Sequence, residues 1–312
     1  MQVIEKSLSE LLVGEPQAYR NLSVVPLLVR RGVAPDYVTL DEALERKLAE
    51  VTEVSESGSV PELAFENTSD TPVLLLDGEE LVGAKQNRIL NLTILAAARA
   101  RLKIPVSCVE QGRWAYRKRS FGSAGRGVYG KLRAAKAQRV SENLRASESR
   151  AANQGEIWRD IDAKFAKLGA VSESRAMGDI YAQNDRRISD YVRAFSALPG
   201  QAGAVFAIDG VIVGLELFDA AGTFAKLLPK LVSSYAMDAI ESRSGSAVPP
   251  VEEAVRRFIE EMKQGVAEQY PALGMGTDIR INGPALAGGA LVVEDRVVHL
   301  AAFRVETPVR AR

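Results

Sequence analysis

The chain has 312 residues, with 40 basic and 40 acidic side chains and 46% hydrophobic residues, which is typical of a soluble globular protein. Its formal charge of zero leaves no global field to attract nucleic acid or a membrane surface, and no apolar run approaches the ~20 residues that span a bilayer. Cys108 and His299 are the only residues of their kinds, which excludes an intrachain disulfide, a Cys/His zinc site and the two-histidine metalloprotease motif. Glu5 and Glu10 interrupt the apolar pattern of the first residues, which argues against a secretory signal and predicts a cytoplasmic protein.

The first third of the chain is predicted to consist mostly of strands. Short apolar runs bounded by turn-forming residues predict strands at 21–30, 60–69 and 103–114. Leucines at helical spacing predict a helix at 40–51. The run 71–83 is predicted to form a hairpin that turns at Asp77-Gly78.

The rest of the chain combines helices with two further hairpins. Apolar residues recur at helical spacing in 154–169, 175–196, 222–240 and 249–266. The Asp209-Gly210 turn signal predicts a hairpin at 204–218, and a final hairpin is predicted at 288–305. This order predicts an α+β fold with a mostly antiparallel sheet, a central helical segment and C-terminal helices.

After the Asp77-Gly78 turn, a half-buried strand would alternate apolar and polar residues. The sequence instead has a run of consecutive polar residues. If 81–95 continues as a strand, one face carries Lys85, Asn87 and Asn91 and the other carries Gln86 and Arg88, so neither face is apolar. One interpretation is an edge strand with solvated side chains. The other is a cleft where these amides and cations converge on a ligand.

Two acidic residues, Glu79 and Glu80, stand just before this polar run. Pairing with Lys85 or Arg88 would make them structural. Alternatively, they would serve as a general base or as ligands of a hard cation such as magnesium.

The segment 113–150 is strongly basic, with eleven Lys/Arg against Glu142 and Glu148, a local charge of +9. Its Gly125, Gly130 and Lys131 have P-loop spacing. However, Leu132 stands where Ser or Thr is required, and no buried strand precedes it, so a flexible glycine-rich loop is predicted. The segment is interpreted as solvated surface, as a flap that closes on phosphate, or as a docking surface for an acidic partner. Nucleic acid is disfavoured because few aromatic residues are available for stacking.

The lone cysteine and histidine are both predicted to be core residues. On a strand, Cys108 shares a face with Ile104 and Val106, and a reactive thiol would need exposure. His299 likewise shares a face with Val297 and Ala301.

Five segments carry a family resemblance: "LLLDGEELVGAKQNRILN" (74–91), "IPVSCVEQGRW" (104–114), "GEPQAYRNLSVVPLL" (14–28), "GEIWRDI" (155–161) and "VVHLAAF" (297–303). Through them the chain resembles the ADP-ribosylglycohydrolase- and rhodanese-phosphatase-associated protein family, a bacterial domain of unknown function. The likeness runs over nearly the whole chain, which implies one family domain over 1–312. By association alone, it implies a role near ADP-ribose or nucleotide metabolism, and it supplies no catalytic residues.

The leading hypothesis is that the domain binds an anionic, nucleotide-like small molecule, with ADP-ribose-related compounds as candidates and catalysis left open. Phosphate would be met by Lys85, Arg88 and Arg113. Sugar or base would be held by Gln86, Asn87 and Asn91, with Trp114 adjoining the site. The candidate general bases are Glu79, Glu80 and Glu110. The alternative is a non-enzymatic interaction module that docks an acidic partner through 113–150. No cofactor, metal ligand or oligomeric state is assigned.

Overall fold

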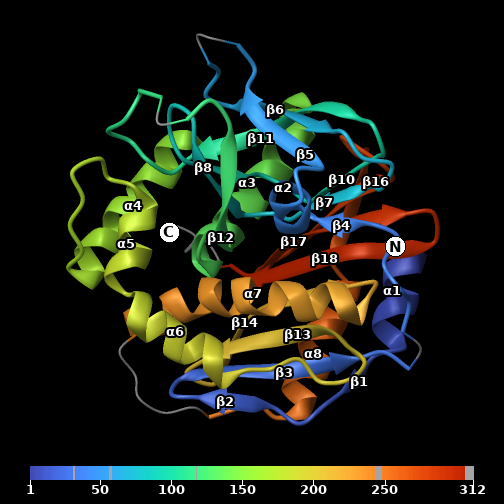
Figure 1. The fold of residues 1–312 in the computed structure, drawn as a ribbon. Helices are drawn as coiled ribbons and strands as arrows, with labels where there is room; N and C mark the ends of the chain where they lie inside the picture. Colours follow the sequence, from blue (N-terminus) through green and yellow to red (C-terminus); the bar gives the residue numbers. More distant parts are fainter. Residues whose placement is uncertain (31, 56–57, 117, 243–247, 306–312) are drawn as a thin grey trace.

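A nine-stranded antiparallel sheet forms the larger β layer of the computed structural model, which describes residues 1–30, 32–55, 58–116, 118–242 and 248–305 (Figure 1). In spatial order its strands are β1 (Leu12–Val13), β3 (Leu22–Leu28), β13 (Gln201–Ile208), β14 (Val211–Phe218), β18 (Arg296–Arg304), β17 (Leu286–Val293), β16 (Thr277–Gly283) and β15 (Val266–Pro271), with β2 (Gln17–Tyr19) paired to β3. The predicted hairpins at 204–218 and 288–305 are confirmed as β13–β14 and β17–β18. Asp209 and Gly210 both have the positive φ that such a tight turn requires.

A six-stranded antiparallel sheet forms the second β layer. Its order is β12 (Phe121–Gly127), β8 (Glu79–Gly83), β9 (Arg88–Leu90), β11 (Arg101–Cys108), β6 (Glu62–Asn67) and β5 (Ala49–Glu53). A bridge between Thr52 and Ser120 joins the two edges, so the sheet curves back on itself around an apolar interior. The short strands β10 (Ile94–Ala96), β7 (Val73–Leu75) and β4 (Val38–Thr39) form a third sheet that packs against this interior.

The helices of the described residues connect and cover these layers. They are α1 (Gln2–Ser9), α2 (Leu40–Glu45), α3 (Gly130–Ser147), α4 (Gln154–Leu168), α5 (Met177–Gln183), α6 (Asp185–Ala194), α7 (Ala221–Ser242) and α8 (Glu252–Lys263). The long helix α7 lies between the two β layers and contacts β13 and β12 (Figure 1). Tyr235 of α7 stacks on Phe206 of β13, with ring centroids 4.1 Å apart. The opposite face of the large sheet is covered by α1 and α8. Together these layers confirm the α+β prediction.

The predicted helix at 40–51 is correct only in its first half. Thr39 caps α2 through reciprocal hydrogen bonds with Glu42. The helix then ends, and Lys47 adopts a positive φ of 56°. The chain continues into β5, where Val51 pairs with Phe65 of β6 and is buried. Pairing with a neighbouring strand therefore overrides a local spacing that favours a helix.

In the predicted hairpin at 71–83 the turn is correct, but the strand pairing is wrong. Gly78 takes the positive φ of a turn. However, β7 pairs with β10, whereas β8 pairs with β9 and β12. The turn therefore leads the chain from one sheet into another.

The interpretation of 81–95 as one strand is also wrong. Gly83 and Ala84 both have positive φ and reverse the chain, so the true hairpin is β8–β9. The interpretation as an edge strand fails too, because β9 lies between β8 and β11.

The helical predictions in the last two thirds hold, with one break. The predicted helices at 154–169, 222–240 and 249–266 correspond to α4, α7 and α8, and α7 extends slightly beyond the prediction at both ends. The segment 175–196 is divided at Asn184 into α5 and α6. Within the described ranges, none of the helices combines the length and apolar character that a bilayer crossing requires.

Candidate functional site

The polar residues after β8 form the loop of the β8–β9 hairpin, and their side chains fold inward. Lys85, Gln86, Asn87 and Arg88 are all buried, Arg88 completely. Gly83 permits this reversal: a Cβ there would lie 2.6 Å from the carbonyl oxygen of Ser120. The loss of apolar–polar alternation in the sequence therefore corresponds to a polar loop whose side chains point inward.

One part of this loop joins a network of two carboxylates. The side-chain amide of Asn87 donates to Glu80 (3.4 Å), and its backbone N–H donates to Glu110 (3.2 Å). Arg113 donates to Glu110 at 2.7 Å and to Asn87 Oδ1 at 3.2 Å. Arg126 of β12 donates to Glu80 at 2.6 Å. The two candidate bases Glu80 and Glu110 thus share one neighbour, Asn87.

The two carboxyl groups have pKa values displaced in opposite directions. Burial raises the pKa of Glu80, and the ion pair with Arg126 only partly offsets this effect. Burial also favours a higher pKa for Glu110, but the hydrogen bonds that it accepts from Arg113 and Asn87 hold its pKa below the ordinary value. Such divergence is typical of acid and base partners, although structural ion-pair networks also produce it.

The other part of the loop surrounds Arg88. Its Nη1 donates to Gln86 Oε1 at 3.0 Å, and the Cys108 thiol donates to the same oxygen. Among the residues that the structure describes, Nε and Nη2 of Arg88 have no hydrogen-bond acceptor and no ion pair is formed. Glu53 and Glu110 attract the guanidinium only from a distance, and burial lowers its pKa. Arg88 is therefore a buried cation without direct neutralisation.

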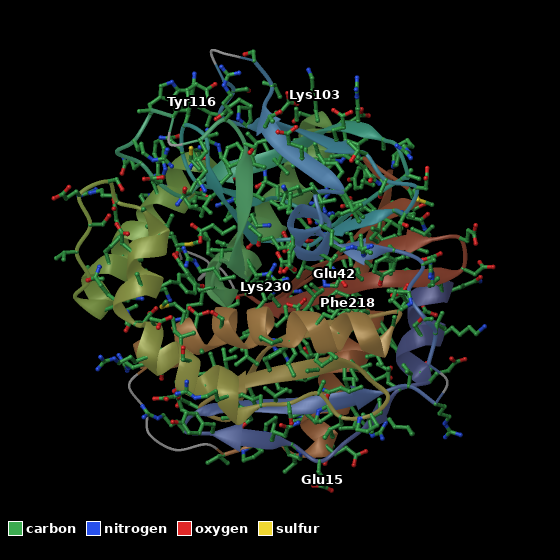
Figure 2. The ribbon with its side chains drawn as sticks, in the orientation of Figure 1. Glu15, Glu42, Lys103, Tyr116, Phe218 and Lys230 are labelled. Carbon is green, nitrogen blue, oxygen red and sulfur yellow. The ribbon has the colours of Figure 1, made fainter. Side chains whose placement is uncertain are left out.

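Two aromatic rings cover these cations at the surface. The Lys85 ammonium lies 5.3 Å from the ring of Trp114 and 5.1 Å from that of Tyr116. The Arg88 guanidinium lies 5.7 Å from Trp114. Trp114 and Tyr116 are 48% and 50% exposed, and Figure 2 labels Tyr116 at the periphery of the molecule. We call Lys85, Gln86, Arg88, Trp114 and Tyr116 the Arg88–Trp114 site.

Two candidate residues lie outside this region. Glu79 faces the opposite side of β8, where it pairs with Lys230 of α7 and accepts the backbone N–H of Leu76 at 2.8 Å. Figure 2 labels Lys230 between α7 and the second β layer. Asn91 hydrogen-bonds Ser107 (2.8 Å) and the carbonyl of Arg150 (3.1 Å). Both are held by structural contacts.

The glycine-rich part of the basic segment is regular, not a loop. Residues 121–127 form β12 and 130–147 form α3. At the start of α3, the N–H of Lys131 donates to the Asp238 carboxylate at 2.8 Å, where a P-loop would hold phosphate. A Cβ at Gly130 would lie 3.1 Å from the same carboxylate. Gly130 and Lys131, which have the P-loop spacing, therefore contribute to the packing of α3 against α7.

Two cations of the basic segment are core residues. Arg133 and Lys136 are buried and both pair with Asp77, and Arg133 also pairs with Glu216. They are not available to an acidic partner or to a phosphate. The sequence contains no signal for this, because Asp77 and Glu216 come from distant segments.

The predictions for the single cysteine and histidine are confirmed. Cys108 is buried, and burial raises the pKa of its thiol to about 11. His299 lies between Thr93 (Nδ1 to Oγ1, 2.8 Å) and Glu216 (Nε2 to Oε2, 3.0 Å). This hydroxyl–imidazole–carboxylate chain borders a cavity of only about 20 Å³, which is room for one water and none for a substrate.

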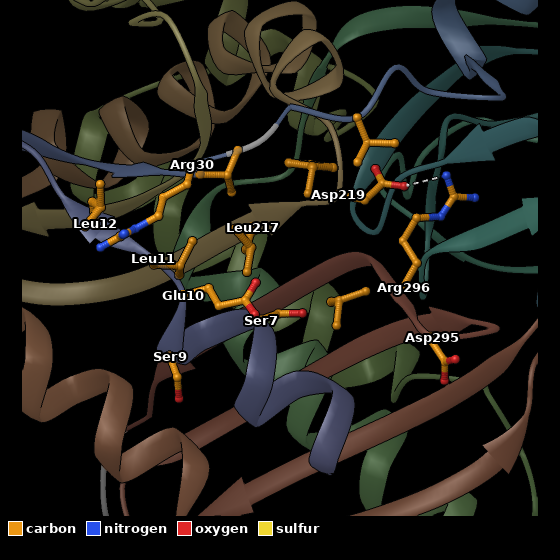
Figure 3. Close-up of a pocket in the computed structure, with 14 residues that line it drawn as sticks. Ser7, Ser9, Glu10, Leu11, Leu12, Arg30, Leu217, Asp219, Asp295 and Arg296 are labelled. Carbon is orange, nitrogen blue, oxygen red and sulfur yellow. Dashed lines mark ion pairs between the residues drawn. The ribbon is translucent and has the colours of Figure 1, made fainter.

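Two further observations bear on ligands. Within the described ranges, no group of three His, Cys, Asp or Glu residues is arranged to hold a metal ion. A cavity of about 710 Å³ opens beside α1, with the Asp219–Arg296 ion pair (3.2 Å) at one end (Figure 3). None of the predicted site residues lines it. Its wall combines four separate segments, so local sequence patterns could not find it.

The model of the "ARG and Rhodanese-Phosphatase-superfamily-associated Protein domain" family matches residues 10–303. The chain belongs to this family. No curated protein and no solved structure matches it. Both the β8–β9 hairpin and the Arg88–Trp114 site lie inside the family domain. Membership does not assign a reaction, so function has to be argued from the site.

Proposed function

We propose that this family domain binds an anionic, nucleotide-like small molecule at the Arg88–Trp114 site. The observation that carries the proposal is the placement of two cations, Lys85 and Arg88, directly beneath two half-exposed aromatic rings. Large aromatic side chains are mostly buried on average, so a half-exposed ring pair over buried cations calls for an explanation.

A nucleotide matches both features of this arrangement. A phosphate group would neutralise the buried Arg88, and charge-assisted hydrogen bonds to such groups are among the strongest in proteins. The base would stack on Trp114 or Tyr116, an interaction worth ~1–3 kcal/mol per base. ADP-ribose and its relatives combine both groups. We take the protein to act in a bacterial cytoplasm, as the sequence predicts.

Any reaction on the bound molecule would use the neighbouring Glu80 and Glu110. Both are candidate general bases, and Glu80 is the stronger base of the two, since burial raises its pKa whereas the contacts of Glu110 lower its pKa. The carboxylates connect to the site through Asn87, which is adjacent in sequence to Arg88.

Thermal unfolding with a ligand panel tests the proposal. The panel is ADP-ribose, AMP, ADP and pyrophosphate, with adenosine and ribose as uncharged controls. A ligand at about 100-fold excess over its Kd stabilises the folded state by about 2.7 kcal/mol, which is readily seen as a rise in Tm. If no anionic member raises Tm at millimolar concentration, binding of this class is ruled out. If adenosine or ribose raises it equally, the cations are not the determinant.

A further inference from the structure

The two unpartnered nitrogens of Arg88 lie on one edge of its guanidinium. Nη1 is occupied by Gln86 Oε1 (3.0 Å) and, more weakly, by the carbonyl of Asn87 (3.5 Å). These contacts fix the plane of the group. The remaining Nε and Nη2 are adjacent donors with parallel N–H bonds, and neither has an acceptor among the described residues.

Leaving such donors buried and unpaired is costly. A buried polar group without a partner loses its hydrogen bonds to water and forms none with the protein. The resulting free-energy cost is larger for a charged group. Orphaned donors in native structures are therefore rare, and a bound ion or ligand is one common reason for them. The Nε/Nη2 edge is also the geometry in which arginine binds two oxygens of one phosphate or carboxylate.

The Trp114 ring lies over the Arg88 guanidinium, with the guanidinium carbon 5.7 Å from the ring centroid, and the backbone of Trp114 is held independently of its ring. Arg113 donates to the carbonyls of Ala84 (2.7 Å) and Ala115 (2.8 Å), and the N–H of Ala115 donates to the carbonyl of Lys85 (3.3 Å). None of these bonds involves the indole. Rotation of the half-exposed ring about its side-chain torsions would therefore break none of these bonds.

We propose that the Nε/Nη2 edge of Arg88 is the receptor for one oxyanion of the ligand, and that Trp114 is a movable cover over it. In the closed form the indole ring shields the guanidinium. In the bound form the ring turns outward, the oxyanion forms two N–H···O bonds with Arg88, and the ring becomes a platform for the base. This inference rests on the proposed function and adds the bound group, its receptor and the moving part.

Fluorescence titration of the Trp158→Phe variant tests the cover. This variant keeps Trp114 as the single tryptophan of the chain. The probes are pyrophosphate, which has phosphate and no base, AMP, which has both, and succinate, which has only carboxylates. Saturable binding of pyrophosphate with a shift in Trp114 emission is expected. Binding without any change in emission would overturn the movable cover.

Arg88→Lys tests the receptor, because it keeps the charge and removes the two-pronged edge. We expect at least ten-fold weaker binding of pyrophosphate. The matched control is Arg99→Lys, at an exposed arginine paired with Asp70, which should bind as the parent does. Unchanged affinity in Arg88→Lys would overturn the inference and leave the proposed function standing. If no anion binds the parent protein at all, the proposed function fails as well.

Trp114→Ala gives a second reading that does not depend on the stability of Arg88 variants, because this side chain is half exposed. We expect pyrophosphate to bind at least as tightly as in the parent, since the cover is gone. AMP should bind roughly ten-fold more weakly, since the stacking platform is lost. Equal losses for both probes would reduce Trp114 to a structural role and overturn the cover. Succinate binding with the same dependence on both residues would support the receptor and assign it to carboxylates.

Discussion

Glu79 and Glu80 are neighbours in β8, but their carboxylates lie in separate networks on opposite faces of the strand. Glu79 pairs with Lys230 of α7, whereas Glu80 pairs with Arg126 of β12. Burial raises the pKa of both groups despite these cations. One residue therefore connects the second β layer to α7, and the next belongs to the region of the candidate site.

Substitution of these two residues should separate their roles. Glu79→Gln leaves the Lys230 ammonium, which is 4% exposed, with Asp41, which is 40% exposed, as its one remaining ion-pair partner among the described residues. Removing one member of a buried pair costs about 3–5 kcal/mol, so a loss of this size is expected in urea unfolding. Glu80→Gln should cost less, because the side chain of Arg126 is 25% exposed and regains water. Equal losses would contradict this division of roles.

Local signals in the sequence predict the hairpins and amphipathic helices well. The β13–β14 hairpin is an example, because the Asp209-Gly210 turn and its two flanking apolar strands follow one another directly in residues 201–218. The 40–51 helix fails in its second half, because pairing of Val51 with Phe65 depends on a strand further along the chain. The same reason explains the failure of the hairpin predicted at 71–83, whose strands pair in two different sheets.

The candidate site shows a similar limit. The sequence marks 85–88 and 110–114 as polar clusters, and the structure brings them together through Asn87, Glu110 and Arg113. The sequence could not reveal that two nitrogens of Arg88 lack an acceptor among the described residues, or that Arg133 pairs with Glu216, because both facts depend on distant segments. That this cluster binds a ligand stays a prediction.

Gly83 should be essential to the inward loop. Alanine there places a Cβ 2.6 Å from the Ser120 carbonyl oxygen, at a φ of +135° that residues with side chains rarely adopt. We expect Gly83→Ala to lower the free energy of unfolding by more than ~1–2 kcal/mol. The control is Gly122→Ala on the adjoining strand, where a new Cβ meets nothing within 4 Å. A loss of equal size in the control would remove the special role of Gly83.

Cys108 should be unreactive in the folded protein. Burial raises the pKa of its thiol to about 11, so almost no thiolate exists at pH 8. A colorimetric disulfide reagent at pH 8 is expected to modify it only after denaturant is added, at the rate set by unfolding. Arg88→Lys keeps the nearby positive charge and should leave this protection intact. Fast stoichiometric labelling of the native protein would show instead that the interior of the site is open to solvent.

Glu241 should make the folded state sensitive to acid. Burial opposes ionisation, but hydrogen bonds from Lys164 and Lys167 outweigh it and lower the pKa to about 2, from an ordinary value of 4.5. A carboxyl whose folded pKa is depressed adds stability that is fully present above the unfolded pKa and is lost as the pH falls toward the folded one. Glu241→Gln should therefore be less stable than the parent at pH 7, and the difference should shrink between pH 4.5 and 2. Urea unfolding across this range measures it, with Glu173→Gln at an exposed position as the control. A difference that stays constant down to pH 2 would mean that the ionised carboxylate contributes nothing to the lysine cluster.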